Sequence, residues 1–176
     1  MELMKKGENI QHKYLPEFVY GGIDGSVTTF AVVSGVMGAS LAPAIVLILG
    51  FANLFADGFS MAVSDYLSMK SRNDMKTSKA NAKKSAFATF VAFILIGFIP
   101  LLSFVLATIT KSPHLAQNQF NYSIILTGFA FLFIGWFKGK ITKRSELKSS
   151  LQTLFIGGTA ALVSFLVGYF IKMLIG

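Results

Sequence analysis

Long apolar segments alternate with short polar ones along the chain from about residue 15 onward. Each apolar segment approaches or exceeds the roughly 20 residues that cross a bilayer as a helix. Segments of this length with few internal charges predict an all-α membrane protein with five transmembrane helices. The predicted helices occupy residues 15–38, 41–69, 85–108, 122–137 and 151–175 of a single transmembrane domain.

The polar segments predict how these helices connect. The link at residues 37–41 is very short, so the first two helices should form an antiparallel hairpin. Pro100 falls inside the third apolar segment and should kink that helix, because proline has no N–H to donate. Residues 109–121 are polar and predict a loop.

Composition and charge narrow the class of protein. The chain is 53% apolar and 14% charged, whereas a soluble domain has about 25% charged residues. Its net charge is +8, but the Lys and Arg residues gather in short polar stretches rather than along one exposed face, which argues against a nucleic-acid partner. Of the 16 basic residues, 14 lie before the first helix or in residues 70–84 and 138–150. Because cytoplasmic loops are rich in Lys and Arg, the N-terminus is predicted in the cytoplasm and the C-terminus on the opposite side.

Several function classes are disfavoured. The chain has no Cys, which excludes disulfides and thiolate metal sites. It has no hydrolase, zinc-protease or phosphate-loop motif, so we expect no enzyme activity and no cofactor. A charged start before an apolar run also fits a cleaved signal peptide, but this run is long and contains Asp24. With no organelle signal visible, we expect a prokaryotic cytoplasmic membrane.

Three acids interrupt the first two apolar segments: Asp24, Asp57 and Asp65. A charged residue at the bilayer centre costs at least about 2.5–3.5 kcal/mol, so such residues usually face the bundle interior and bind ions or protons. At 3.6 residues per turn, Asn53, Asp57, Met61 and Asp65 share one face of the second helix. A hairpin turn near residues 39–41 would place Asp24 level with Asp57.

These side chains suit a divalent first-row metal, since carboxylate and amide oxygens are joined by one thioether. The predicted metal-site residues are Asp24, Met61, Asp57, Asn53 and Asp65. Simpler interpretations remain open. Asp65 can pair with a Lys at the cytoplasmic edge, Asp24 and Asp57 can form a structural pair, and Met61 can fill the core.

Four stretches of the chain resemble the vacuolar iron transporter family of iron and manganese transporters. They are residues 20–36 (YGGIDGSVTTFAVVSGV), 52–71 (ANLFADGFSMAVSDYLSMKS), 131–145 (FLFIGWFKGKITKRS) and 154–163 (LFIGGTAALV). The resemblance implies five transmembrane helices, a homodimer with the ion path between protomers, and exchange of Fe2+ or Mn2+ for protons. It also implies that Asp24 and Met61 bind the ion, and Asn53, Asp57 and Asp65 match the family's second helix.

The sequence also departs from the family's pattern. Many members carry a Glu-rich cytosolic domain between helices two and three, but here residues 70–84 form a short basic connector. Arg72 stands where the family usually has Glu, and Ile23 where it usually has Asn.

The favoured hypothesis is a proton-coupled transporter that exports Fe2+ or Mn2+ from the cytosol. In this hypothesis Asp24 and Met61 bind the ion, and Asp57 helps to bind it or carries the exchanged proton. One alternative is a passive divalent-metal channel. Another is a membrane protein with a structural role, in which the acids are paired and static.

Overall fold

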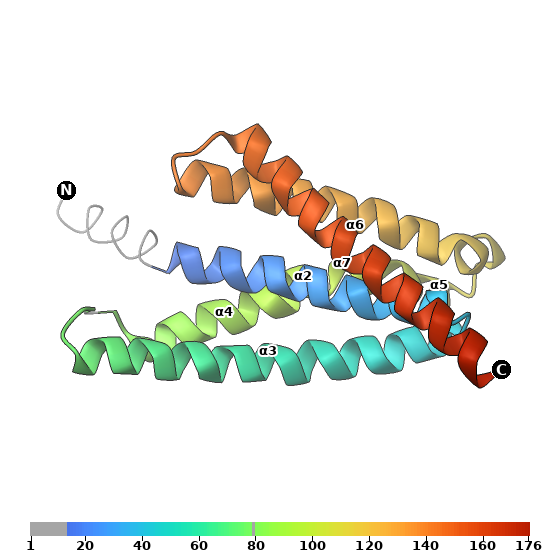
Figure 1. Ribbon diagram of the computed structural model, residues 1–176, viewed down its shortest axis with the longest axis horizontal. Helices are drawn as coiled ribbons and strands as arrows, with labels where there is room; N and C mark the ends of the chain where they lie inside the picture. Colours follow the sequence, from blue (N-terminus) through green and yellow to red (C-terminus); the bar gives the residue numbers. More distant parts are fainter. Residues whose placement is uncertain (1–13, 79) are drawn as a thin grey trace.

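The structure, a computed structural model, describes residues 14–78 and 80–176. Helices carry the labels of Figure 1. They are α2 (Leu15–Gly38), α3 (Pro43–Asp74), α4 (Ala82–Gly97), a 3-10 turn η1 (Ile99–Leu101), α5 (Leu102–Thr110), α6 (Pro113–Ile141) and α7 (Glu146–Ile175). Because η1 and α5 continue α4, the described chain forms five long helices, as the sequence predicts.

The described helices make this an integral membrane protein. Four of them are long and apolar enough to span a bilayer: α3, the combined α4–α5, α6 and α7. In α2, 24 residues long, Asp24 and several Gly, Ser and Thr residues lower the hydropathy, and this helix falls outside that group. The helices that surround α2 explain why it contains so many small and polar residues.

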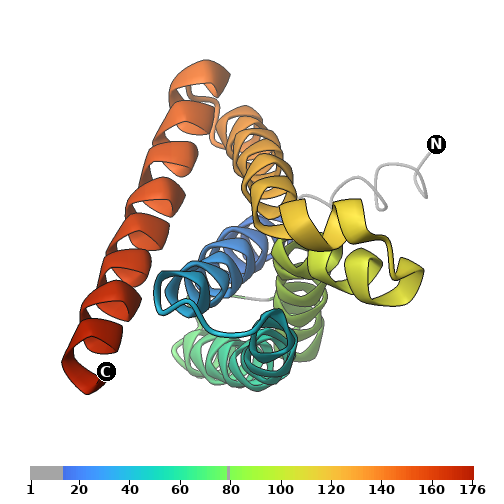
Figure 2. The same cartoon turned by 90° about the vertical axis from the view of Figure 1, so that its right-hand side faces the viewer.

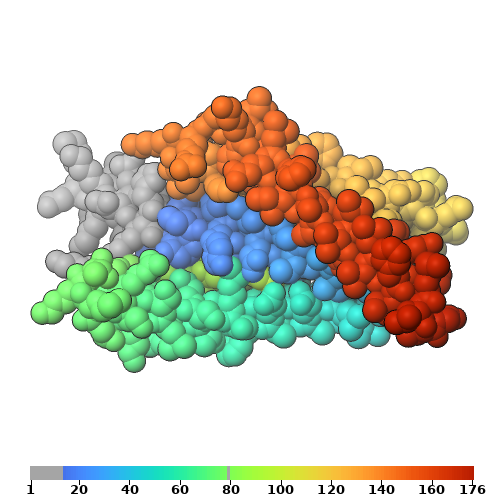
Figure 3. All heavy atoms as spheres, viewed as in Figure 1, coloured from blue at the N-terminus to red at the C-terminus, as the bar shows by residue number. Residues whose placement is uncertain are grey.

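Helix α2 lies at the centre of the bundle and contacts α3, α4, α6 and α7 (Figures 1 and 2). Figure 3 shows the surface of α2 as a blue band between α3 and the orange helices. Two glycines one turn apart, Gly21 and Gly25, face α4. A Cβ atom on either would lie 2.5 Å from a carbonyl oxygen of α4, that of Thr89 or Phe93. The two backbones therefore touch directly, which fixes the rotation of α2 about its own axis.

The third membrane helix is interrupted at Pro100, which confirms the predicted kink. The turn η1 separates α4 from α5 at this residue. Two buried hydroxyls bond to backbone carbonyls across the break: Ser123 Oγ donates to Pro100 O at 2.6 Å, and Ser103 Oγ donates to Gln119 O at 2.7 Å. These bonds join the broken helix to α6.

The helices are longer than their apolar segments, and one loop prediction is wrong. Residues 113–121, predicted as part of a polar loop, form the first turns of α6, with Pro113 in the first turn, where its missing N–H has no helical partner to lose. Likewise α3 continues to Asp74, and α7 begins at Glu146 after Ser145, whose side chain accepts from the Lys148 N–H. Hydropathy marks the part of a helix that suits lipid, whereas the helix itself extends beyond that part.

The two ends of the bundle differ in charge. The start of α2, the α3–α4 connector and the α6–α7 connector lie at one end, and the C-terminus lies at the other (Figure 1). Of the described basic residues, five in residues 70–84 and five in residues 138–148 lie at the first end, which we call the basic end. Lys111 and Lys172 lie at the opposite end. The predicted basic segment before the first helix falls in residues 1–13, outside the described residues, as does Lys79.

Candidate metal-ion groove

An open groove of about 560 Å³ runs between α2 and α3 in the half of the bundle nearest the basic end. We call it the acidic groove. Most of the side chains that line it are polar or charged: Glu17, Tyr20 and Asp24 of α2, and Asp57, Ser60, Met61, Ser64, Asp65, Ser68 and Arg72 of α3, together with Pro16. The three acids that interrupt the first two apolar segments, Asp24, Asp57 and Asp65, therefore line one groove.

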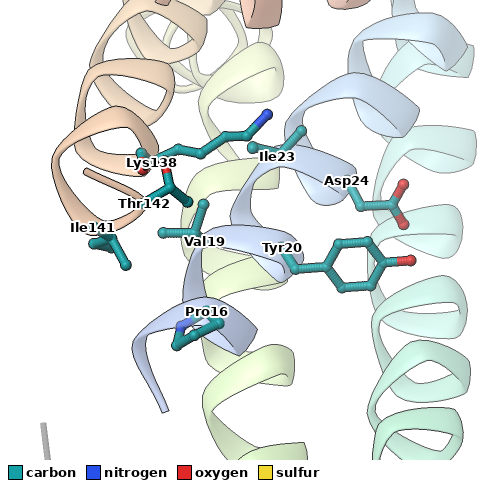
Figure 4. A pocket seen from close by; sticks show the side chains of 8 residues that line it. All are labelled: Pro16, Val19, Tyr20, Ile23, Asp24, Lys138, Ile141 and Thr142. Atoms are coloured by element: carbon teal, nitrogen blue, oxygen red, sulfur yellow. Dashed lines mark hydrogen bonds between the residues drawn. The ribbon is translucent and has the colours of Figure 1, made fainter. Parts of the chain in front are cut away.

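The α2 wall of the groove follows from helical periodicity. Glu17, Tyr20 and Asp24 lie three and four residues apart and so share one face. Gly21 and Gly25 pack on α4, and the Asp24 side chain extends towards α3 (Figure 4). Close backbone packing on one side of α2 thus directs its acid to the other side.

The α3 wall matches the predicted stripe. Asp57, Met61 and Asp65 are half-buried and spaced four residues apart, and all three line the groove opposite Asp24. Met61 also packs against the hydrophobic core of the bundle. The predicted juxtaposition of Asp24 with Asp57 in one site is therefore present, with the thioether beside them.

In the part of the chain that the structure describes, Asp65 is held by hydroxyl groups of α4 rather than by a Lys at the cytoplasmic edge. Its Oδ2 atom accepts hydrogen bonds from Ser85 Oγ at 2.8 Å and from Thr89 Oγ1 at 3.1 Å, both on α4. Both hydroxyl residues are fully buried. One carboxylate oxygen of Asp65 is thus fixed by α4, which holds α3 against α4 at this level.

Asn53 is the one predicted site residue that does not line the groove. It lies one helical turn from Asp57, further from the basic end, and its buried Nδ2 atom has no hydrogen-bond partner in the described part of the chain. The structure brings together Asp24, Asp57, Met61 and Asp65, and leaves Asn53 beyond them.

Two charged residues of the groove were missed: Glu17 and Arg72. A spacing signal existed for both, because Glu17 precedes Asp24 by seven residues and Arg72 follows Asp65 by seven, which is two turns in each case. The Oε2 atom of Glu17 is buried and has no hydrogen-bond partner among the described residues. Within residues 14–78 and 80–176, no three Asp, Glu or His side chains are close enough together to hold a metal ion, so the acids are spread along the groove.

Acids that line a groove between two membrane helices are the feature that marks an ion pathway in transporters. The VIT family model matches residues 15–83 and 75–169, which is most of the chain. The chain therefore belongs to the VIT family. The two matched parts meet at the α3–α4 connector, where the sequence predicts that a cytosolic domain is absent.

Named relatives agree with this assignment. The vacuolar iron transporter of Plasmodium berghei (strain Anka) is 24% identical over 230 aligned positions, covering 93% of this chain and 84% of the relative. Vacuolar iron transporter 1 of Arabidopsis thaliana is 26% identical, covering 85% and 82%. Both are named as transporters rather than enzymes, as the sequence predicts. Both are eukaryotic, so they give no support to a prokaryotic cytoplasmic membrane, which stays a prediction.

Proposed function

We propose that this protein transports a divalent metal ion, Fe2+ or Mn2+, out of the cytosol in exchange for protons. The observation that carries the proposal is the acidic groove, in which Asp24, Asp57, Met61 and Asp65 line one open path between α2 and α3. Carboxylate oxygens attract hard divalent cations, and a thioether favours a softer first-row ion over Mg2+ or Ca2+. The names of the relatives support iron as the cargo.

In this proposal Asp24 and Met61 bind the ion from opposite walls, and Asp57 either binds with them or carries the exchanged proton. A carboxylate must lose its proton to bind a metal, so binding and release of the ion are linked to proton movement. Asp65, with one oxygen fixed by α4, is suited to receive the ion between the basic end and Asp24.

The direction of transport and the assembly are also proposed. Ten described basic residues at one end support a cytoplasmic location for that end, and the groove lies in this half. No three acids of the described chain converge on one point, which supports a homodimer in which two grooves combine their ligands.

The test is metal uptake into proteoliposomes that contain an internal pH dye, with Fe2+ or Mn2+ added outside. We expect metal entry accompanied by alkalinisation of the interior, because protons leave as metal enters. Asp24→Asn should abolish both signals. Asp74→Asn, a change at an exposed acid outside the groove, should preserve them and serves as the matched control.

Size-exclusion chromatography of the purified variant would verify that Asp24→Asn is folded. Uptake that survives in this variant would refute the role assigned to Asp24. Metal entry without any pH change would identify a passive channel instead of an exchanger.

A further inference from the structure

A second hollow borders α2, on the side that faces α6 (Figure 4). Its volume is about 360 Å³. Its walls are mainly apolar, with Val19 and Ile23 on α2 and Ile141 on α6, and Lys138 of α6 reaches into it. We call it the Lys138 pocket. The metal-transport proposal makes no use of it.

Lys138 supplies the charge of this pocket. The residue is half-buried, and its side chain extends from α6 towards Ile23, so that the ammonium group lies over the apolar wall of α2 (Figure 4). Thr142 also lines the pocket. Its hydroxyl already donates its proton to the Lys138 carbonyl, at 2.9 Å, so on α6 Lys138 is the donor that remains for a ligand. Asp24 borders the pocket as well, but its carboxylate points to α3, away from Lys138 (Figure 4).

The position of the pocket along the bundle indicates the depth of an interfacial headgroup. Lys138 lies in the last turns of α6, at the basic end. On the same helix the Lys140 ammonium lies 5.1 Å from the ring centroid of Trp136. Tryptophan and lysine at a helix end mark the boundary between the acyl chains and the headgroups.

We propose that the Lys138 pocket binds an anionic phospholipid, with the phosphate at the Lys138 ammonium and the start of an acyl chain against Val19, Ile23 and Ile141. Basic pockets between transmembrane helices on the cytoplasmic side suit acidic headgroups. The ten described basic residues at this end attract anionic lipid to it. A free phosphate ion fits poorly, because the apolar walls offer its remaining oxygens no hydrogen bonds in exchange for water.

Native mass spectrometry of the full chain in a neutral detergent tests this inference. The probe is phosphatidylglycerol, compared with phosphatidylcholine of the same acyl chains. We expect a phosphatidylglycerol adduct that survives mild activation and a much weaker phosphatidylcholine adduct. Lys138→Ala should reduce the adduct by about fivefold, the factor expected for removing one basic residue from an acidic lipid surface.

Two further variants separate the pocket from general surface charge. Lys148→Ala removes an exposed cation at the same end without touching the pocket, and should weaken the adduct clearly less than Lys138→Ala does. Ile141→Trp keeps every charge but fills the apolar space, and should weaken the adduct. Equal loss in the Lys138 and Lys148 variants, equal retention of the two lipids, or no adduct at all would each overturn the proposal. Binding is measured without metal, so the result is independent of transport.

Discussion

Helices α2 and α7 belong to the same bundle but occupy opposite environments. Helix α2 contacts four other helices, yet it is rich in Gly, Ser and Thr and carries Asp24. Helix α7 contains an apolar stretch long enough to span a bilayer, yet only 11% of that stretch is buried. Large side chains such as Phe155, Leu162 and Phe170 point outward from it. The more hydrophobic helix is therefore the more exposed one.

The comparison shows that, in a bilayer, the hydropathy of a helix does not predict how much of the helix is buried. Lipid tails are as apolar as a protein core, so an apolar side chain gains little by moving inward. The buried positions are instead occupied by residues that let two backbones approach closely or that need polar partners. Gly21 and Gly25 serve the first purpose on α2, and the fully buried Ser85 and Thr89 of α4, whose hydroxyls donate to Asp65, serve the second.

The strongest test of this contrast is one substitution made in both helices. Gly25→Ala would place a methyl group 2.5 Å from the Phe93 carbonyl oxygen, so the backbones of α2 and α4 must separate. We expect a loss of about 3 kcal/mol or more in the free energy of unfolding. Denaturant unfolding of purified protein in mixed micelles would measure it.

The matched control is Gly158→Ala on α7, where a Cβ atom would meet nothing within 4 Å. Here we expect no loss and a gain of up to about 1 kcal/mol, because alanine is the better helix former. Similar losses for the two variants would show that the bundle does not distinguish these environments.

A smaller effect is expected where one methylene group is added. Val33 on α2 is 0% exposed, whereas Val163 on α7 is 55% exposed. Val33→Leu should cost about 1–2 kcal/mol, because the surrounding core has no space for the extra volume. Val163→Leu should change the unfolding free energy by less than about 0.5 kcal/mol. The order of the two melting temperatures in detergent is a sufficient readout, and a reversed order would contradict the comparison.

The smallest expected effect concerns the contact between the two helices. Ser164 Oγ of α7 donates to the Ala31 carbonyl of α2 at 2.6 Å. Ser164→Ala should cost about 0.6 kcal/mol, the average for a hydrogen bond between membrane helices. The matched control is Thr159→Ala. The Thr159 hydroxyl donates to the Phe155 carbonyl within α7, so its removal leaves the contact with α2 intact. Denaturant unfolding of the two variants in mixed micelles would measure the difference, and equal losses would contradict the comparison.

The sequence predicted most of what depends on periodicity and little of what depends on packing. The five helices, the break at Pro100 and the stripe of Asp57, Met61 and Asp65 all follow from local patterns. Glu17 was within reach of the same reasoning, through its spacing of seven residues from Asp24. The hydroxyl partners of Asp65 and the Lys138 pocket were beyond it, since both depend on how α4 and α6 pack against their neighbours.

The polarity of α2 has a consequence for how the protein is made. A nascent helix partitions from the translocon into lipid according to its hydropathy, and α2 has less of it than the helices that follow. It also leaves the ribosome before α4, α6 and α7, the helices that cover its glycines and hydroxyls. The contacts that cover α2 are therefore complete only after these later helices have joined it, so that the packing of the most central helix is finished last.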